Sequence, residues 1–223
     1  AGQSCTREMA RRAFDTLAED GVRIPVWTNH GGPENSHNLL RADSIGDLAD
    51  SRSYLSDLAV DYGIRFVWIS ELTHVIGQDR DVTEGEYYRT YPDRSPLIRF
   101  VSRLLHPVSG RLIRKLRVEP YRGNRLLEPA CLRDGRPVFA FRRYGRWRYD
   151  TISVLPRILE PATLDRLIES RGAMLVYLHI GPSKDETSEN FREGMLCLRE
   201  VANRFRDRSL WVTRSSDLLI HAA

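Results

Sequence analysis

"GVRIPVW" (residues 21–27) and "GIRFVW" (residues 63–68) repeat one pattern, a glycine followed by a short apolar segment with the character of a strand. Apolar residues at helical spacing precede each segment, over residues 9–18 and 54–62. Glycine readily ends a helix in the left-handed conformation, and short apolar strands preceded by amphipathic helices are typical of a parallel sheet covered on both faces. The two segments therefore predict two helix–glycine–strand units.

The pattern occurs twice more toward the C-terminus. A helical pattern that ends before Gly172 leads to a predicted strand over residues 173–178, and another over residues 191–205 leads to a predicted strand over residues 209–213. Four such units predict an α/β protein, built as a (β/α) barrel whose parallel strands end on one side. We expect these neighbouring parallel strands to carry, or end near, Trp27, Trp68, Leu178 and Trp211.

Residues 80–155 interrupt the pattern and predict an insertion in the barrel. Within it, the basic amphipathic stretch 97–116 predicts a helix, which either packs on the barrel, as we favour, or contacts an anionic glycan, a membrane surface or a partner. Residues 126–150 predict a β-hairpin that turns at Asp134-Gly135, because Asp-Gly is a strong turn signal between apolar runs. No low-complexity linker separates these parts, so we expect one domain over residues 1–223.

The composition excludes several classes of protein. The chain has 223 residues, of which 41% are hydrophobic, and this is enough to bury a substantial core. No stretch approaches the roughly 20 apolar residues of a membrane helix. No signal-peptide pattern is visible, which slightly favours the cytoplasm, although a chain that begins at Ala1 leaves open a targeting segment upstream. The three cysteines are far apart, which argues against a disulfide framework and against a cysteine zinc site.

Arginine supplies nearly all of the positive charge, and the formal net charge is +4. Arginine binds carboxylates and phosphates well, so an anionic polymer is one possible partner. The chain contains no recognisable nucleic-acid-binding motif, and we therefore expect no nucleic-acid partner. The oligomeric state does not follow from the sequence.

Polar residues follow each predicted strand. Asn29-His30 follow the first strand, Ser70-Glu71 the second, His179 the third and Thr213 the fourth. Ligands and catalytic groups gather at the carboxyl ends of parallel strands, so these residues predict a site at that edge of the sheet. For any single histidine, the alternative is a loop residue that is hydrogen-bonded to the backbone.

Three segments together resemble a divergent polysaccharide deacetylase of the NodB-homology type. They are "FDTLAEDGVRIPVWTNHGGPENSHN" (14–38), "GIRFVWISELTHVIGQ" (63–78) and "AMLVYLHIGPSKDETSENFREGMLCLREVANRFRDRSLWVTRSSDLL" (173–219). The resemblance covers most of the chain outside the insertion. It implies a distorted (β/α) barrel that uses a divalent metal ion, usually zinc, to remove acetyl groups from an acetylated oligo- or polysaccharide.

The resemblance also implies roles for individual residues. His30 and His37 match the two histidine ligands of the metal, although they are spaced i, i+7 where the family has i, i+4. His179 in "VYLHIG" matches the general acid, and Arg143 in "FRRYGRW" echoes the arginine that orients the catalytic base. The family's Asp-Asp pair does not occur in this chain, and the resemblance would place it upstream of Ala1. The chain therefore looks either incomplete at its N-terminus or inactive.

These residue types suit amide or ester hydrolysis. A metal ion held by imidazoles and a carboxylate activates water near neutral pH and polarises a carbonyl group, and a histidine titrates in the right range to protonate the leaving group. Gly31, Gly32 and Pro33 allow a sharp turn between the two ligands, so we expect His30 and His37 to approach one another. Further expectations are that His179 faces the same cavity as His30, and that the asparagines of the loop serve turn chemistry rather than support of the ligands. The predicted function is a metal-dependent carbohydrate deacetylase, and the alternative is an inactive relative that binds a glycan or a protein partner.

Overall fold

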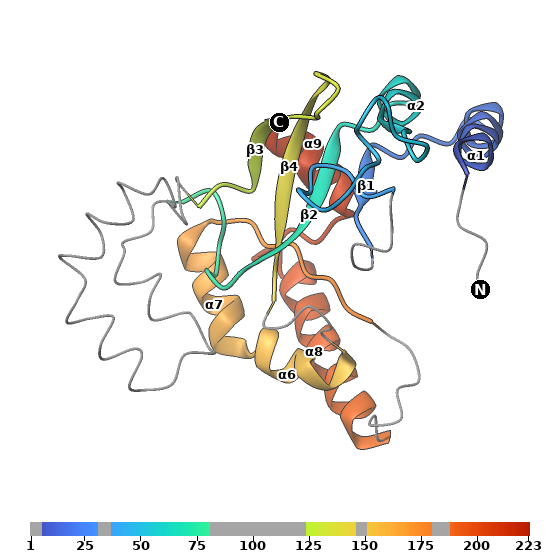
Figure 1. The fold of residues 1–223 in the computed structure, drawn as a ribbon. Helices are drawn as coiled ribbons and strands as arrows, with labels where there is room; N and C mark the ends of the chain where they lie inside the picture. The colour runs from blue at the N-terminus through green and yellow to red at the C-terminus, as the bar shows by residue number, and fades with distance from the viewer. Residues whose placement is uncertain (1–5, 31–36, 81–123, 146–150, 180–187) are drawn as a thin grey trace. The chain divides into compact units, whose positions relative to one another are not determined.

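The computed structural model describes residues 6–30, 37–80, 124–145, 151–179 and 188–223 (Figure 1). The chain divides into two compact units, and each is described by itself. The first unit consists of Ala1–Glu71, Leu127–Arg143 and Thr213–Ala223, and the second of Leu72–Leu126 and Tyr144–Val212.

Among the described residues, four strands form one mixed sheet in the order β1-β2-β4-β3. β1 (Val26–Thr28) pairs in parallel with β2 (Phe66–Thr73), so that Trp27 lies opposite Val67 and Thr28 opposite Trp68. The two segments that define the repeated pattern are therefore neighbouring parallel strands, and this prediction is confirmed. β3 (Leu127–Cys131) pairs antiparallel with β4 (Pro137–Tyr144). The protein is a mixed α/β protein with an open sheet.

The two helices predicted before the first two strands are confirmed as α1 and α2. α1 (Arg7–Glu19) begins after Thr6, whose side chain accepts a hydrogen bond of 3.2 Å from the Met9 N–H, and Gly21 follows with a φ of +70°. α2 (Ser56–Tyr62) ends at Gly63, where φ is +123°. α9 (Ser215–Ala222) lies at the C-terminus (Figure 1). Glycine adopts these positive φ values without a steric penalty.

The core of the first unit lies between the sheet, α2 and the segment after β1. Phe14 of α1 stacks on Tyr62 of α2 with 4.9 Å between ring centroids, and Trp27 packs against the same cluster. The buried members of this cluster are Leu39, Leu55, Ala59, Ile64, Val67, Leu132 and Val138.

The hairpin predicted inside residues 80–155 is confirmed. It turns at Asp134-Gly135, where Gly135 has a φ of +89° and the Leu132 N–H donates a hydrogen bond of 2.9 Å to the Arg136 carbonyl. The Asp134 carboxylate accepts hydrogen bonds of 2.5 Å from the Ser56 hydroxyl and 3.0 Å from the Tyr54 hydroxyl, which fix the turn against the start of α2. The hairpin places β4 directly beside β2 in the sheet.

The described part of the second unit is largely helical. Its elements are η1 (Ile152–Val154), α6 (Leu155–Ile158), α7 (Pro161–Ser170) and α8 (Ser188–Arg206). α8 packs against η1 and α6, and the buried core includes Ile152, Leu155, Ile158 and Leu164. The two helices predicted before residues 173 and 209 are confirmed as α7 and α8.

Two of the four predicted strands are wrong. Residues 173–178 form no strand, although Ala173, Val176 and His179 make isolated bridges to Gln78, Tyr144 and Thr151 respectively. Residues 209–213 are irregular, and Trp211 is 56% exposed. Leu178 and Trp211 therefore do not lie in strands parallel to those of Trp27 and Trp68. An apolar run becomes a strand only when a neighbouring strand completes its hydrogen bonds, and neither segment has such a ladder among the described residues.

The predicted basic helix over residues 97–116 lies outside the described residues, as does most of the predicted insertion. Within the described ranges, none of the helices combines the length and the apolar character that crossing a membrane requires.

Candidate functional site

Two asparagine side chains hold the base of the loop that follows β1. The Asn29 amide donates to the Leu39 carbonyl at 2.7 Å and accepts from the Leu39 N–H at 2.9 Å. The Asn38 amide in turn donates to the His30 carbonyl at 3.2 Å and accepts from the His30 N–H at 3.1 Å. Asparagine amides can bond backbone groups as a neighbouring peptide would. Since both asparagines are buried, these four bonds close the loop reciprocally.

His30 and His37 therefore lie at the two feet of one loop, at the carboxyl end of β1. The Asn38 side chain holds the backbone of His30, and His37 directly precedes Asn38 in the chain. His30 is exposed and His37 is half-buried. The turn between them, residues 31–36, lies outside the described residues, as does Asn35. The approach of the two imidazole rings stays a prediction, whereas the expected turn chemistry is confirmed for Asn29 and Asn38.

The segment after this loop folds back beneath it. Leu40 has a φ of +59°, which is unusual for a residue with a side chain. Gly46 packs against the backbone of the loop foot, where an added Cβ would lie 2.7 Å from the His37 carbonyl oxygen and 2.8 Å from that of Asn38. Only glycine permits so close an approach, so the position of residues 37–38 depends on the segment that contains Gly46.

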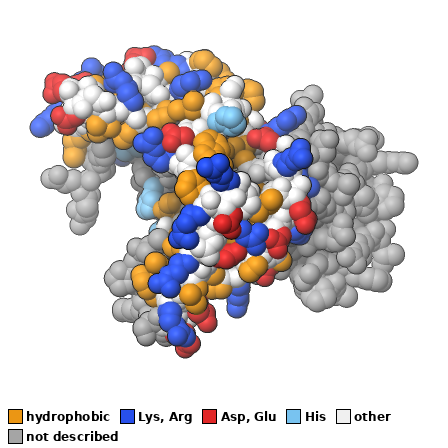
Figure 2. All heavy atoms as spheres, turned by 180° about the vertical axis from the view of Figure 1, so that it is seen from behind, with side chains coloured by type: hydrophobic (Ala, Val, Ile, Leu, Met, Phe, Trp, Pro, Cys, Tyr) orange, Lys and Arg blue, Asp and Glu red, His pale blue; other side chains and the backbone are white. Residues whose placement is uncertain are grey.

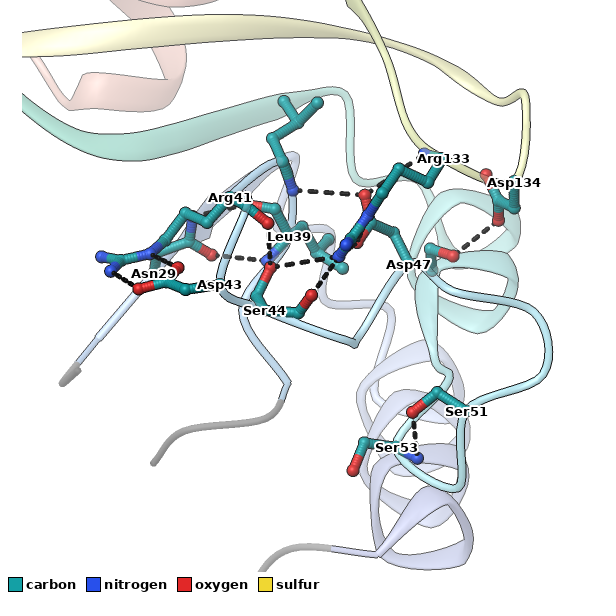
Figure 3. Close-up of polar contacts among 12 residues, drawn as sticks. Asn29, Leu39, Arg41, Asp43, Ser44, Asp47, Ser51, Ser53, Arg133 and Asp134 are labelled. Atoms are coloured by element: carbon teal, nitrogen blue, oxygen red, sulfur yellow. Dashed lines mark hydrogen bonds and ion pairs between the residues drawn. The ribbon is translucent and has the colours of Figure 1, made fainter. Parts of the chain in front are cut away.

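An ion pair between the buried Asp47 and the exposed Arg133 secures that segment (Figure 3). Asp47 is fully buried, and its carboxylate accepts hydrogen bonds from the Arg133 guanidinium and, at 3.2 Å, from the Arg133 N–H. The Arg133 guanidinium also donates to the Ser44 carbonyl oxygen. Arg133 belongs to the turn between β3 and β4, so the hairpin and the loop after β1 are joined through Asp47.

The end of β2 carries a second group of polar residues. Ser70 has a φ of +64° within the strand, and the Trp68 indole N–H donates to the Glu71 carbonyl at 3.2 Å. Arg142 of β4 donates to Glu71 at 2.7 Å and also to Glu128. Burial opposes the charge of Arg142, but its hydrogen bonds to Glu128 and Glu71 outweigh that cost and raise its pKa.

Arg143 is a buried residue of β4, only 2% exposed. Its guanidinium lies over the Trp68 ring of the neighbouring strand, 4.9 Å from the ring centroid. Cation–π contacts of this kind hold a guanidinium in a defined orientation. The predicted role of Arg143 in orienting a catalytic base stays a prediction.

His179 belongs to the second unit and is half-buried. Its Nε2 lies 3.3 Å from the Tyr177 hydroxyl, and the two rings meet edge to face with centroids 4.9 Å apart. A parallel bridge joins its backbone to Thr151. The expectation that His179 shares a cavity with His30 stays a prediction.

Zinc in proteins is held by histidine, cysteine and carboxylate ligands, and catalytic sites commonly use three. The imidazoles of His30 and His37 are suitable donors. Within the described residues, no three histidine, cysteine, aspartate or glutamate side chains form a group that could hold a metal ion. Asp47 is engaged by Arg133. The two imidazoles are therefore of a type that zinc binds, and they are the two candidate ligands in the described part of the chain.

Arginine side chains on the surface are interleaved with acidic ones. Figure 2 shows positive and negative side chains side by side among hydrophobic ones on the face drawn. Arg204 donates to Glu200 at 2.8 Å and to Asp165 at 2.7 Å, and Arg41 pairs with Asp43 at 2.6 Å. Pairs of this kind neutralise arginine charge locally, which favours a structural role for these arginines over capture of an anionic polymer.

Asp47, Arg133 and Gly46, which hold the segment after the loop in place, were not predicted from the sequence. Asp47 and Arg133 are 86 residues apart, and no local spacing marks them as partners. Gly46 looks like an ordinary loop glycine in the sequence. In the sequence, the only indication of how the loop is held was that Asn29 and Asn38 stand next to the two histidines.

Comparisons of the chain with models of known protein families, with curated proteins and with solved structures gave no match.

Proposed function

We propose that the chain is a divergent carbohydrate deacetylase, a metal-dependent hydrolase that removes acetyl groups from an acetylated oligo- or polysaccharide. The observation that carries the proposal is the reciprocal clamp of Asn29 and Asn38, which holds His30 and His37 at the two feet of one loop. The loop lies at the carboxyl end of a strand in a parallel pair, where α/β proteins place their ligands. On this proposal, the open sheet is part of a distorted (β/α) barrel.

His30 and His37 would hold a divalent ion, most suitably zinc. A bound zinc ion would supply Lewis-acid chemistry by polarising the carbonyl of the acetyl group. The remaining roles come from the resemblance alone. His179 would give a proton to the leaving group, and Arg143 would orient the base. The resemblance assigns the base to an Asp-Asp pair that this chain does not contain.

The test combines metal binding with turnover. Zinc binding to the full chain is measured by isothermal titration calorimetry for wild type, His30→Ala and His37→Ala, and acetate release is measured on N- and O-acetylated oligosaccharides. Loss of a true ligand should weaken binding by more than the roughly 10- to 100-fold seen when only a residue behind the ligand is changed. His221→Ala is the matched control, because His221 is exposed in α9.

The alternative function is that of an inactive relative, which binds a glycan or a protein partner. If it binds a glycan, acetylated oligosaccharides should bind without release of acetate. The spacing of His30 and His37 and the missing Asp-Asp pair are the features that favour it. Equal zinc affinity in wild type, His30→Ala and His37→Ala would overturn the proposed metal site.

A further inference from the structure

The hairpin turn reaches the loop after β1 through one arginine. Arg133 donates hydrogen bonds to Asp47 from its backbone N–H, at 3.2 Å, and from its guanidinium. The guanidinium also donates to the Ser44 carbonyl oxygen. Figure 3 shows Arg133 extended over Ser44 and Asp47 from the hairpin side. One side chain thus fixes both ends of the segment from Ser44 to Asp47.

That segment carries the contact to His37. Gly46 lies between Ser44 and Asp47 in the chain and packs directly on the His37 and Asn38 carbonyl groups. Asp47 also accepts a hydrogen bond of 3.4 Å from the Leu40 N–H, just beyond the loop foot. The buried carboxylate of Asp47 needs its counter-charge, because an uncompensated buried charge is strongly unfavourable. A shift of Arg133 must therefore move Asp47, Gly46 and the backbone of His37 together.

We infer that Arg133 is a positioning residue for His37. From the hairpin turn, Arg133 sets the position of the His37 imidazole through Asp47 and Gly46. The inference rests on the proposed metal site for its functional meaning. The contacts that link Arg133, Asp47, Gly46 and His37 do not depend on a metal, because each of them is between described protein groups. On this inference, Arg133 acts through Asp47 and Gly46 and not by direct contact with a metal ion.

The first experiment needs no metal. Long-range ¹H–¹⁵N NMR spectra of the histidine side chains are recorded for metal-free wild type and Arg133→Lys. Lysine keeps the positive charge beside Asp47, and we therefore expect this variant to fold. Lysine lacks the planar guanidinium group that bonds Asp47 and Ser44 at the same time. We expect the His37 ring resonances to shift and those of His221 to stay in place.

The matched control is Arg142→Lys. Arg142 belongs to β4 of the same hairpin and bridges two carboxylates, Glu71 and Glu128, but no hydrogen bond links it to residues 37–47. Its replacement should leave the His37 resonances unchanged. Unmoved His37 resonances in Arg133→Lys, or equal shifts in both variants, would overturn the inference.

A second experiment links Arg133 to the metal through a double-mutant cycle. Zinc affinity is measured for wild type, Arg133→Lys, His37→Ala and the double variant. We expect Arg133→Lys to weaken binding by about 10- to 100-fold, the usual effect of a residue that supports a ligand. In the His37→Ala background the same change should have no further effect.

If wild type binds no zinc while Arg133→Lys moves the His37 resonances, the proposed function fails and the positioning role remains. If wild type and His37→Ala differ in affinity while Arg133→Lys matches wild type and its His37 resonances stay in place, only the positioning role fails.

Discussion

The two terminal nitrogens of Arg7 donate hydrogen bonds of 2.7 and 2.6 Å to the two carboxylate oxygens of Asp57, and this bidentate pair joins α1 to α2. The Arg7 guanidinium also donates to the Tyr54 carbonyl at 2.8 Å and lies over the Tyr54 ring. None of the residues of α1 is buried. The helix is therefore attached by this polar contact and by the stacking of Phe14 on Tyr62, rather than by a large apolar face.

Replacing Arg7 by alanine should loosen α1 more than it destabilises the protein. We expect the amides of α1 to exchange faster with solvent, while the free energy of unfolding falls by about 1 kcal/mol, as for a half-exposed charge-assisted pair. Hydrogen exchange and urea unfolding measure the two effects. Arg11→Ala is the control in the same helix, because Arg11 meets Glu8 only at 3.9 Å on the surface. Equal exchange in both variants would contradict the role of Arg7.

Acid should destabilise the first unit through two aspartates. Hydrogen bonds from Arg7 lower the pKa of Asp57 despite its burial. Burial opposes ionisation of Asp134, but hydrogen bonds from Ser56, the Arg136 N–H and Tyr54 together lower its pKa as well. A carboxyl group with a lowered pKa in the folded state stabilises the protein above its unfolded pKa, about 3.9, and this stabilisation is lost as the pH falls toward the folded pKa.

The pH dependence is measured as the urea midpoint between about pH 6 and pH 2. We expect the midpoint of wild type to fall with decreasing pH below about 4. Asp57→Asn and Asp134→Asn should each start lower at pH 6 and depend less on pH. A variant with the slope of wild type would show that the replaced carboxyl group does not contribute.

Replacing Gly46 by alanine should disturb the foot of the loop that carries His37. The added Cβ would lie 2.7 Å from a backbone oxygen, which cannot move as a flexible side chain can. We expect a loss of about 1 to 3 kcal/mol in stability, the usual cost of overpacking, together with changed NMR shifts at His37 and Asn38. Gly21→Ala is the control for these shifts, because its added methyl group meets nothing within 4 Å and its cost is the backbone strain of alanine at a φ of +70°. It should leave those shifts unchanged.

Replacing Asn29 by alanine should open the loop at its base. The change removes both partners of the buried Leu39 backbone groups, and we expect a loss of about 2 to 3 kcal/mol in unfolding free energy. Asn203→Ala removes only an exposed contact to Arg206 in α8 and should cost less than about 0.5 kcal/mol. Similar losses in the two variants would show that the Asn29 clamp is not important for the loop.

The parts of the fold that depend on local sequence were predicted correctly. Gly21 marks the end of α1, and Asp134-Gly135 marks the hairpin turn, because helix-ending and turn conformations involve only neighbouring residues. The segments after Gly172 and before Thr213 were predicted wrongly. Their apolar residues suit a strand, but a strand also requires a partner distant in the sequence, which periodicity does not report.

In the candidate site, too, local contacts were predicted from the sequence and contacts between distant residues were not. Asn29 and Asn38 stand beside the histidines in the sequence, so their turn chemistry was predicted. The pairing of Asp47 with Arg133 depends on the fold, because it joins a loop after β1 to a hairpin much later in the chain. Likewise, nothing in the sequence near Arg143 indicates that its guanidinium lies on the Trp68 ring.

The proposed role of His179 leads to a prediction about turnover. If His179 protonates the leaving group, His179→Ala should lower the turnover of an acetylated oligosaccharide by about 100-fold or more, the size expected for loss of a general acid, while zinc affinity stays that of wild type. Tyr177→Phe keeps the edge-to-face ring contact and removes only the hydroxyl that lies 3.3 Å from Nε2. Because that hydroxyl hydrogen-bonds one ring nitrogen but leaves the imidazole in place, its removal should lower turnover less than His179→Ala does. His221→Ala should match wild type in both measurements. Unchanged turnover in His179→Ala would remove this histidine from the mechanism, and a fall in zinc affinity in that variant would instead make it a ligand rather than an acid.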